Sequence, residues 1–413
     1  MITAHQPERF RRVLQSLLVA MVFVIPFSIA AIEILFPLLL VAWLISETGQ
    51  ATASQRTLLR VTEKAVLWAL GLYAGTCTLS VFYSEFFLLS LTGLVGKTFE
   101  YTLLFLIAFR AIQQPSMPER CLQALLLAAW LVVLHSLLQQ GAIARAVYKS
   151  TVRDPILGRT LEYVRMQGPY KNPNDLATYL MVVGSIALSD ILHQSRIVWS
   201  RYALVALMIG SMVWTQSRAA LLGFFCGAPL FLVLFWKDRK RRWGILLLLV
   251  AAVIFFCYLA RLTLREALTL TDIGSLDRAT MWKTAWAMIQ TNPLWGHGIN
   301  TFMANYTKYV GDSSRWPAYA HNCYLQIVAE TGLVGLVSFV AFLIFLGSCI
   351  CESLKIRKDP LLAGLAAGLV AFLVQSTFDT NFYALRQAAL FWTLAGIAFG
   401  LCVQILRNNP QSI

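Results

Sequence analysis

Long apolar runs separated by short polar segments make up most of the chain. The runs are about 20 residues long and carry little charge, and a helix of that length crosses the hydrocarbon core of a bilayer. Each run must be helical, because lipid offers no partner for an unpaired backbone N–H or C=O group. We therefore predict an all-α, polytopic membrane protein with about 12 transmembrane helices. The expected spans lie near residues 14–30, 32–46, 65–82, 90–110, 121–139, 174–192, 201–216, 219–236, 243–260, 331–351, 361–378 and 386–406.

The polar gaps between these runs divide the chain into five segments. We expect short helices inside the two long gaps. At the N-terminus, Arg9, Arg11 and Arg12 precede an apolar stretch, as in a secretion signal. Apolar sequence resumes at once, however, so we expect a helical hairpin that turns near residues 26–33. The segments are 1–139 with helices 1–5, 140–173 as the first long loop, 174–260 with helices 6–9, 261–322 as the second long loop, and 323–413 with helices 10–12.

Basic residues in the short loops predict the orientation. They recur in every second loop, which marks the cytoplasmic side, whereas the opposite short loops carry Glu33, Glu85 and Asp379 with few cations. We expect both termini in the cytoplasm and both long loops outside it. The cytoplasmic cations are Arg9, Arg11, Arg12, Arg56, Arg60, Lys64, Arg110, Arg120, Arg196, Arg201, Lys237, Arg239, Lys240, Arg241, Arg242, Lys355, Arg357, Lys358 and Arg407.

Composition supports this class and narrows the chemistry. The chain is 58% hydrophobic and only 13% charged, far from the averages of water-soluble domains. The eight cysteines show no metal-finger spacing, and we interpret them as small core residues. No Asp-x-Asp pair or histidine–carboxylate cluster occurs in the outer segments. We expect no metal, no other cofactor and no nucleic acid partner.

The two long loops carry more basic than acidic residues. Membrane insertion does not account for this excess, because long loops translocate largely regardless of their charge. A basic outer surface favours an anionic ligand. Attraction to anionic lipid headgroups explains the same charge equally well. The bases are Arg145, Lys149, Arg153, Arg159, Arg165 and Lys171 in the first loop and Arg261, Arg265, Arg278, Lys283, Lys308 and Arg315 in the second.

Three arginines are candidates for binding an anion. Arg218 lies at a membrane boundary in a short outer loop, where the alternative is snorkelling to headgroups. Arg265 follows Arg261 by four residues, a spacing that suits either phosphate binding or headgroup anchoring. Arg278 opens a predicted helix with Asp277 as its N-cap, so free backbone N–H groups would lie beside it. The apolar face predicted for that helix comprises Trp282, Ala285, Trp286 and Ile289.

Among the five histidines, His321 lies where the second long loop re-enters the membrane. An imidazole there can serve a cavity at headgroup level, although a boundary histidine is also compatible with a structural role. Within the membrane, Lys97 and Glu100 are three residues apart on one helix, and we expect them to neutralise each other.

Taken together, these local patterns resemble the O-antigen ligase family, which belongs to a wider group with O-antigen polymerases and protein O-oligosaccharyltransferases. The resemblance covers about residues 165–340, and its most specific part is the histidine–asparagine element with two glycines downstream. Length, helix count and the long loop before the histidine favour a ligase. The motifs are Gly168-Pro-Tyr-Lys-Asn-Pro-Asn-Asp175, Thr215-Gln-Ser-Arg-Ala-Ala-Leu221, Arg278-Ala-Thr-Met-Trp282, Asn292-Pro-Leu-Trp-Gly-His-Gly298 and His321-Asn322 with Gly332 and Gly335.

The resemblance implies an inner-membrane enzyme that faces the periplasm. It would transfer O-antigen from undecaprenyl diphosphate to a sugar hydroxyl of the lipid A–core oligosaccharide. Arg218, Arg278 and Arg265 would bind the diphosphate and stabilise its growing charge. His321 would act as the general base of an inverting, metal-independent reaction.

Several alternatives stay open on the sequence alone. A polymerase or a protein O-oligosaccharyltransferase would use the same motifs. A covalent glycosyl-enzyme would need a carboxylate such as Glu330 or Asp277. A transporter of lipid-linked glycans is the rival from another class, but we find no repeat between the two halves of the sequence and the notable polar groups gather on one face.

Overall fold

The computed structural model describes residues 6–48, 60–141, 148–153, 160–193, 198–227, 273–310 and 319–408, and these residues are almost entirely helical. The N-terminal elements are α1 (Gln6–Val24), α2 (Ile29–Thr48), α3 (Val61–Phe82), α4 (Phe87–Gly93), the π-helix η1 (Leu94–Phe99), α5 (Glu100–Ala111), α6 (Met117–Gly141), β1 (Tyr148–Arg153) and β2 (Thr160–Arg165). The remaining elements are α7 (Pro173–His193), α8 (Trp199–Trp214), α9 (Arg218–Leu222), the π-helix η2 (Gly223–Gly227), α12 (Ile273–Thr291), α13 (Phe302–Tyr309), α14 (Cys323–Ile356), α15 (Pro360–Gln375), the 3-10 helix η3 (Asn381–Tyr383) and α16 (Leu385–Arg407).

Seven of the described helices are long and apolar enough to cross a membrane, which confirms an all-α polytopic membrane protein. The expected hairpin of α1 and α2 is present, with its turn at residues 25–28. The span expected near 243–260, and the part of the preceding one beyond residue 227, lie outside the described residues. The seven helices are Ile29–Glu47, Val61–Phe82, Phe87–Ala111, Met117–Gln139, Pro173–Leu192, Cys323–Ile356 and Leu385–Arg407.

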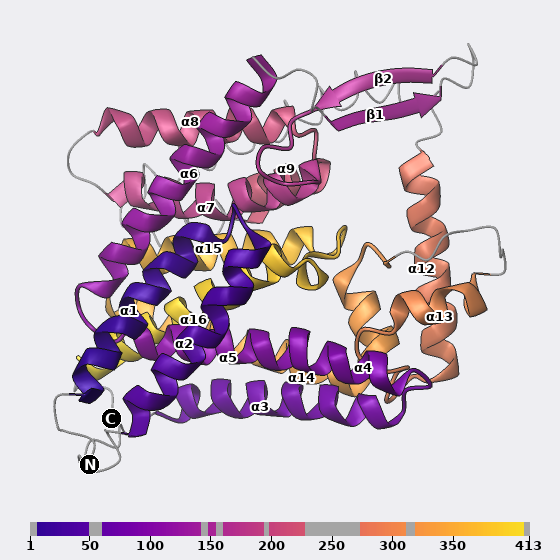
Figure 1. Cartoon of the computed structure of the whole chain (residues 1–413), viewed down its shortest axis with the longest axis horizontal. Helices are drawn as coiled ribbons and strands as arrows, with labels where there is room; N and C mark the ends of the chain where they lie inside the picture. Colours follow the sequence, from indigo (N-terminus) through magenta and orange to yellow (C-terminus); the bar gives the residue numbers. More distant parts are fainter. Residues whose placement is uncertain are drawn as a thin grey trace.

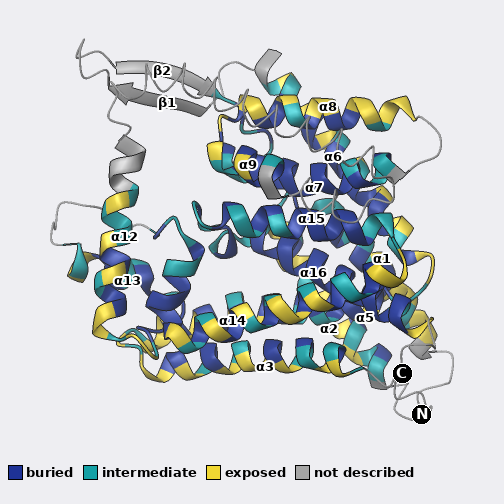
Figure 2. Cartoon of the chain, turned by 180° about the vertical axis from the view of Figure 1, so that it is seen from behind, coloured by how far each residue is buried: buried dark blue, intermediate teal, exposed yellow. Residues whose placement is uncertain are grey.

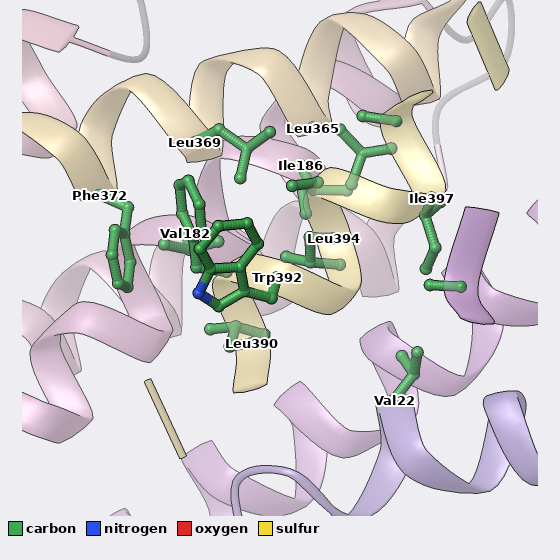
Figure 3. Close-up of a cluster of buried hydrophobic side chains, with 14 of the residues drawn as sticks. Val22, Val182, Ile186, Leu365, Leu369, Phe372, Leu390, Trp392, Leu394 and Ile397 are labelled. Atoms are coloured by element: carbon green, nitrogen blue, oxygen red, sulfur yellow. The ribbon is translucent and has the colours of Figure 1, made fainter. Parts of the chain in front are cut away.

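Close contacts between helices occur at small residues. α16 packs along α5 at Gly396, where a Cβ atom would lie 2.3 Å from the carbonyl oxygen of Phe105. α15 packs along α7 at Gly368, where a Cβ atom would lie 2.8 Å from the carbonyl oxygen of Val182. Backbones approach this closely in membranes because van der Waals contact, not water exclusion, holds the helices together. Figure 3 shows the buried side chains between these helices, with Trp392 among them.

The bundle has two distinct ends (Figures 1 and 2). α1 begins and α16 ends at the inner end, where Arg60 donates to the backbone carbonyl of Leu406 and lies 3.5 Å from Glu352. β1, β2, α12 and α13 lie at the opposite end, called the outer end below. Loops expected in the cytoplasm and loops expected outside it are therefore separated in space. The direction of insertion stays a prediction.

Where the structure describes it, the first long loop forms a β-hairpin in place of the expected short helix. β1 and β2 pair antiparallel, with Tyr148 opposite Arg165 and Arg153 opposite Thr160. Both segments are rich in valine, threonine and tyrosine, which favour extended backbone over helix.

The second long loop is helical, but its first described helix begins earlier than expected. α12 starts at Ile273, so Asp277 is not its N-cap and Arg278 lies beyond its first turn. The four residues before Asp277 contain no proline, and the single glycine among them, Gly274, costs a helix only about 1 kcal/mol, so an earlier start is tolerated. Ala285 and Ile289 are buried against α13 and α14 as expected, whereas Trp286 is 57% exposed.

Candidate active site

A histidine and an aspartate from separate loops meet at the outer end. His321 precedes α14, and Asp379 lies between α15 and α16. The Nδ1 atom of His321 is 3.2 Å from Oδ1 of Asp379. The Asp379 side chain is 11% exposed and that of His321 is 33% exposed. The carboxylate is thus enclosed, while the imidazole remains partly accessible.

The start of α14 is bonded to the loop that carries Asp379. The backbone N–H of Cys323 donates to the carbonyl of Ser376 at 2.9 Å, and the Cys323 thiol donates to the carbonyl of Asp379 at 3.1 Å. The Asp379 carboxylate also accepts the N–H of Thr380 at 2.9 Å. These bonds fix the two loops against each other independently of the His321 side chain.

Asn322 shapes the turn that presents His321. Its Oδ1 atom accepts the backbone N–H groups of Tyr324 and Leu325, both at 3.0 Å, and so caps α14. His321 itself has a φ of 46°, a value that is uncommon for a residue with a side chain. The histidine–asparagine element therefore combines a constrained, partly exposed imidazole with a helix cap.

Glycines in α14 and in the turn after α12 allow the two backbones to pack closely together. α14 is broken at Gly332, where φ is 70° and a Cβ atom would lie 1.9 Å from the carbonyl oxygen of Leu294. At Gly296 a Cβ atom would lie 2.4 Å from the carbonyl carbon of Glu330. The N–H of Gly298 donates to the carbonyl of Glu330 at 2.8 Å. Only glycine allows the turn after α12 to enter the break.

Glu330 is fully buried, and both of its carboxylate oxygens accept hydrogen bonds. Oε1 accepts the backbone N–H of Phe302 at 3.1 Å and the side-chain amide of Gln326 at 3.2 Å. Oε2 accepts the backbone N–H of Asn300 at 2.8 Å and the hydroxyl of Tyr383 at 3.0 Å. This carboxylate anchors the loop, and the structure offers no geometric support for it as a nucleophile.

Lys97 does not pair with Glu100 as expected. Its Nζ atom donates to Oδ1 of Asn300 at 2.7 Å. It also lies 5.1 Å from the ring centroid of Tyr383 and 5.6 Å from that of Tyr319. Burial raises the pKa of both phenols, so their hydroxyls stay protonated at neutral pH. The prediction failed because Lys97 lies in the π-helix η1, where helical spacing no longer places i and i+3 side by side.

Arg218 is the first residue of α9 and is exposed. The preceding turn bends sharply, since Gln216 has a φ of 57°. The turn is attached to the end of β2, because Nε of Arg165 donates to the carbonyl of Thr215 at 2.7 Å. The short outer loop is thus bonded to the first long loop, and the Arg218 side chain is available to a ligand.

Arg278 lies on α12 next to an open hollow of about 440 Å³. Arg278, Trp282 and Trp286 follow one another at intervals of four residues and so share a helix face. Leu325, one turn along α14 from His321, contributes to the same hollow. The lining residues are Ala279, Trp282, Lys283, Trp286 and Leu325.

The structure brings His321 together with Asp379 but joins neither to the predicted arginines. Within the described ranges, no hydrogen bond or ion pair links Arg218 or Arg278 to the His321–Asp379 pair. Arg265 lies outside the described residues. The role of the three arginines in binding diphosphate therefore stays a prediction.

Sequence reasoning missed Asp379 as a partner of His321. The sequence analysis placed Asp379 only among the acids of the outer short loops. The expectation that Asp379 and His321 lie on the same side of the membrane was the one sequence signal for their contact. The contacts of Lys97 with Asn300, Tyr319 and Tyr383 were not predicted either, although a lysine within a membrane span is unusual.

The motif that begins at Gly168 has a structural role. Gly168 has a φ of 55°, and a Cβ atom there would lie 2.3 Å from the hydroxyl of Ser136. The carbonyl of Pro169 accepts a hydrogen bond from Arg386 at 3.0 Å, and the Arg386 guanidinium lies 4.6 Å from the ring centroid of Tyr170. The motif holds the start of α16, next to the loop that carries Asp379.

Over the residues that the structure describes, no three histidine, cysteine, aspartate or glutamate side chains gather as they would around a metal ion.

Comparison with known families identifies one domain. Residues 203–340 match the family model Wzy_C, described as O-antigen ligase. The matched residues make up about a third of the chain. The matched range contains Arg218, Arg278 and His321, whereas Asp379 and Lys97 lie outside it. The match does not distinguish a ligase from a polymerase. A comparison with curated proteins gave no match.

Proposed function

We propose that this protein transfers a glycan from undecaprenyl diphosphate to a sugar hydroxyl of the lipid A–core oligosaccharide at the periplasmic face of the inner membrane. The observation that carries the proposal is the contact between His321 and Asp379 at the start of α14. The family match over residues 203–340 supplies the class of substrate.

The chemistry follows from the geometry of the pair. In the proposed tautomer Nδ1–H of His321 donates a hydrogen bond to Asp379, which leaves the lone pair on Nε2 free to act as a base. The acceptor hydroxyl attacks the anomeric carbon, and its proton passes to Nε2. The bond between that carbon and the phosphate oxygen breaks, and undecaprenyl diphosphate leaves with the electron pair. One direct displacement inverts the anomeric configuration. Asp379 then stabilises the imidazolium.

Arginine is suited to the leaving group. Negative charge grows on the bridging oxygen, and a guanidinium offers fixed donors that keep their protons. A cation about 4 Å from one phosphate charge contributes roughly 4 kcal/mol at an effective dielectric near 20, before desolvation costs. Two observations support this role for Arg218 and Arg278. Arg218 is exposed at the start of α9, after a turn that is bonded to the end of β2, and Arg278 lies on α12 beside the open hollow.

The hollow beside α12 fits the sugars nearest the reacting bond. Trp286 offers an exposed aromatic surface, and Lys283 adds a cation next to it. Leu325 connects this surface to the turn that carries His321. The sugars would pack against the indoles while the diphosphate lies toward Arg278.

Purified protein tested with defined lipid-linked donors distinguishes the candidate activities. We expect transfer to lipid A–core, with inverted configuration and equal rates in EDTA and in magnesium. Extension of a second lipid-linked glycan instead would identify a polymerase, and modification of a protein acceptor would identify an oligosaccharyltransferase. Movement of the donor across liposomes without transfer would identify a transporter.

A further inference from the structure

Lys97 contacts the two loops that carry His321 and Asp379. Tyr319 lies two residues before His321, and Tyr383 lies four residues after Asp379. The two tyrosine rings pack together with centroids 5.9 Å apart. The Lys97 ammonium lies within 5.6 Å of both centroids, a distance at which a cation is attracted to an aromatic face.

A third contact holds the lysine in place. Nζ of Lys97 donates to Asn300, whose backbone N–H donates in turn to Glu330. Asn300 has a φ of 64° and fits against the helix only because position 93 is glycine; a Cβ on Gly93 would lie 2.2 Å from the Cβ of Asn300. The hydrogen bond between Lys97 and Asn300 thus depends on the close approach of Asn300 to α4 at Gly93.

The π-helix adds a reason to expect function here. Extra residues in a helix cost stability and are frequent at functional sites. Lysine within a membrane span is also costly and marks a role beyond packing. Lys97 therefore combines a local helix irregularity, a partly buried charge and contacts to both loops of the His321–Asp379 pair.

We propose that Lys97 is a positioning residue that holds Tyr319 and Tyr383 together and thereby sets the geometry of His321 against Asp379. Lys97 touches neither of these two residues and acts through the tyrosine pair. The catalytic part of this inference rests on the proposed function. The structural part, that Lys97 orders both loops, does not.

Hydrogen exchange measured by mass spectrometry tests the structural part without any activity. In Lys97→Met we expect backbone exchange in residues 319–324 and 379–383 to be at least fivefold faster, with exchange in α16 unchanged. Lys308→Met is the matched control, because Lys308 pairs with Glu85 and lies 5.0 Å from the ring centroid of Phe86 without contacting either loop. Unchanged exchange in Lys97→Met, or equal acceleration in the control, would overturn the proposal.

A second variant guards against misfolding of Lys97→Met. Tyr319→Leu removes the contact with Lys97 and with Tyr383 but leaves the lysine charge in place. It should accelerate exchange in the same two segments. Exchange as slow as in the wild type would overturn the proposal even if Lys97→Met fails to insert.

A double-mutant cycle tests the catalytic part. Lys97→Met should lower kcat at least tenfold and change KM less than twofold. Once Asp379 is replaced by Asn, the same Lys97→Met change should lower kcat less than twofold, because residues that act through one unit are not additive. If the losses in kcat of the two single variants add in the double variant, Lys97 acts independently of Asp379 and the catalytic part of the proposal is wrong. A wild-type protein without transferase activity would defeat the proposed function and leave the exchange result to decide whether Lys97 orders the loops.

Discussion

His321 Nδ1 and Asp379 Oδ1 lie 3.2 Å apart although 58 residues separate them along the chain. Because the carboxylate fixes the imidazole and stabilises its charged form, Asp379→Asn should lower kcat by roughly 10²–10³ with little change in KM. A transfer assay with both substrates varied measures this. Glu85→Gln, which also replaces a carboxylate by an amide but at an exposed residue, is the control and should keep the wild-type kcat. A normal kcat in Asp379→Asn would mean that the contact is only structural.

Arg218→Ala and Arg278→Ala should each lower transfer by about 10²–10³, because each removes a fixed donor from the leaving diphosphate. Lysine at either position should restore little, since an ammonium cannot make paired hydrogen bonds. Detergent gel filtration would check that the variants are intact, and Arg120→Ala at the inner end is the control. Full activity in both alanine variants would exclude an arginine clamp.

The proposed orientation can be tested with single cysteines in a chain whose natural cysteines have been replaced. Lys308→Cys should react with an impermeant maleimide in whole cells, and Lys355→Cys should react only after lysis. Both positions are exposed, so a missing signal cannot be ascribed to burial. The reverse pattern would place His321 in the cytoplasm and end the proposed mechanism.

The sequence predicted the helical class and the hairpin of α1 and α2 because hydrophobic length alone decides whether a helix can span a membrane. It did not predict the partners of Lys97 or Asp379. Those contacts depend on which helix faces pack together, and the apolar faces of membrane helices are chemically alike.

Local errors had local causes. The N-cap assigned to Asp277 was wrong because capping residues also occur inside helices that start earlier. The helix expected in the first long loop was replaced by β1 and β2 because β-branched residues outweighed the general helical pattern. The sequence singled out His321 as a candidate from its position, but not the aspartate beside it, because that contact depends on how the loop between α15 and α16 lies against the start of α14.

The most direct test of the central claim is single-turnover transfer by wild-type protein, His321→Ala and His321→Gln with saturating donor. If His321 is the base, both variants should bind donor normally and lose roughly 10²–10⁴ in rate, because glutamine can form hydrogen bonds but cannot take the proton. The wild-type rate should also fall as acid protonates the imidazole. Near-normal turnover in His321→Gln alone would make His321 an orienting residue, and near-normal turnover in His321→Ala would contradict the account.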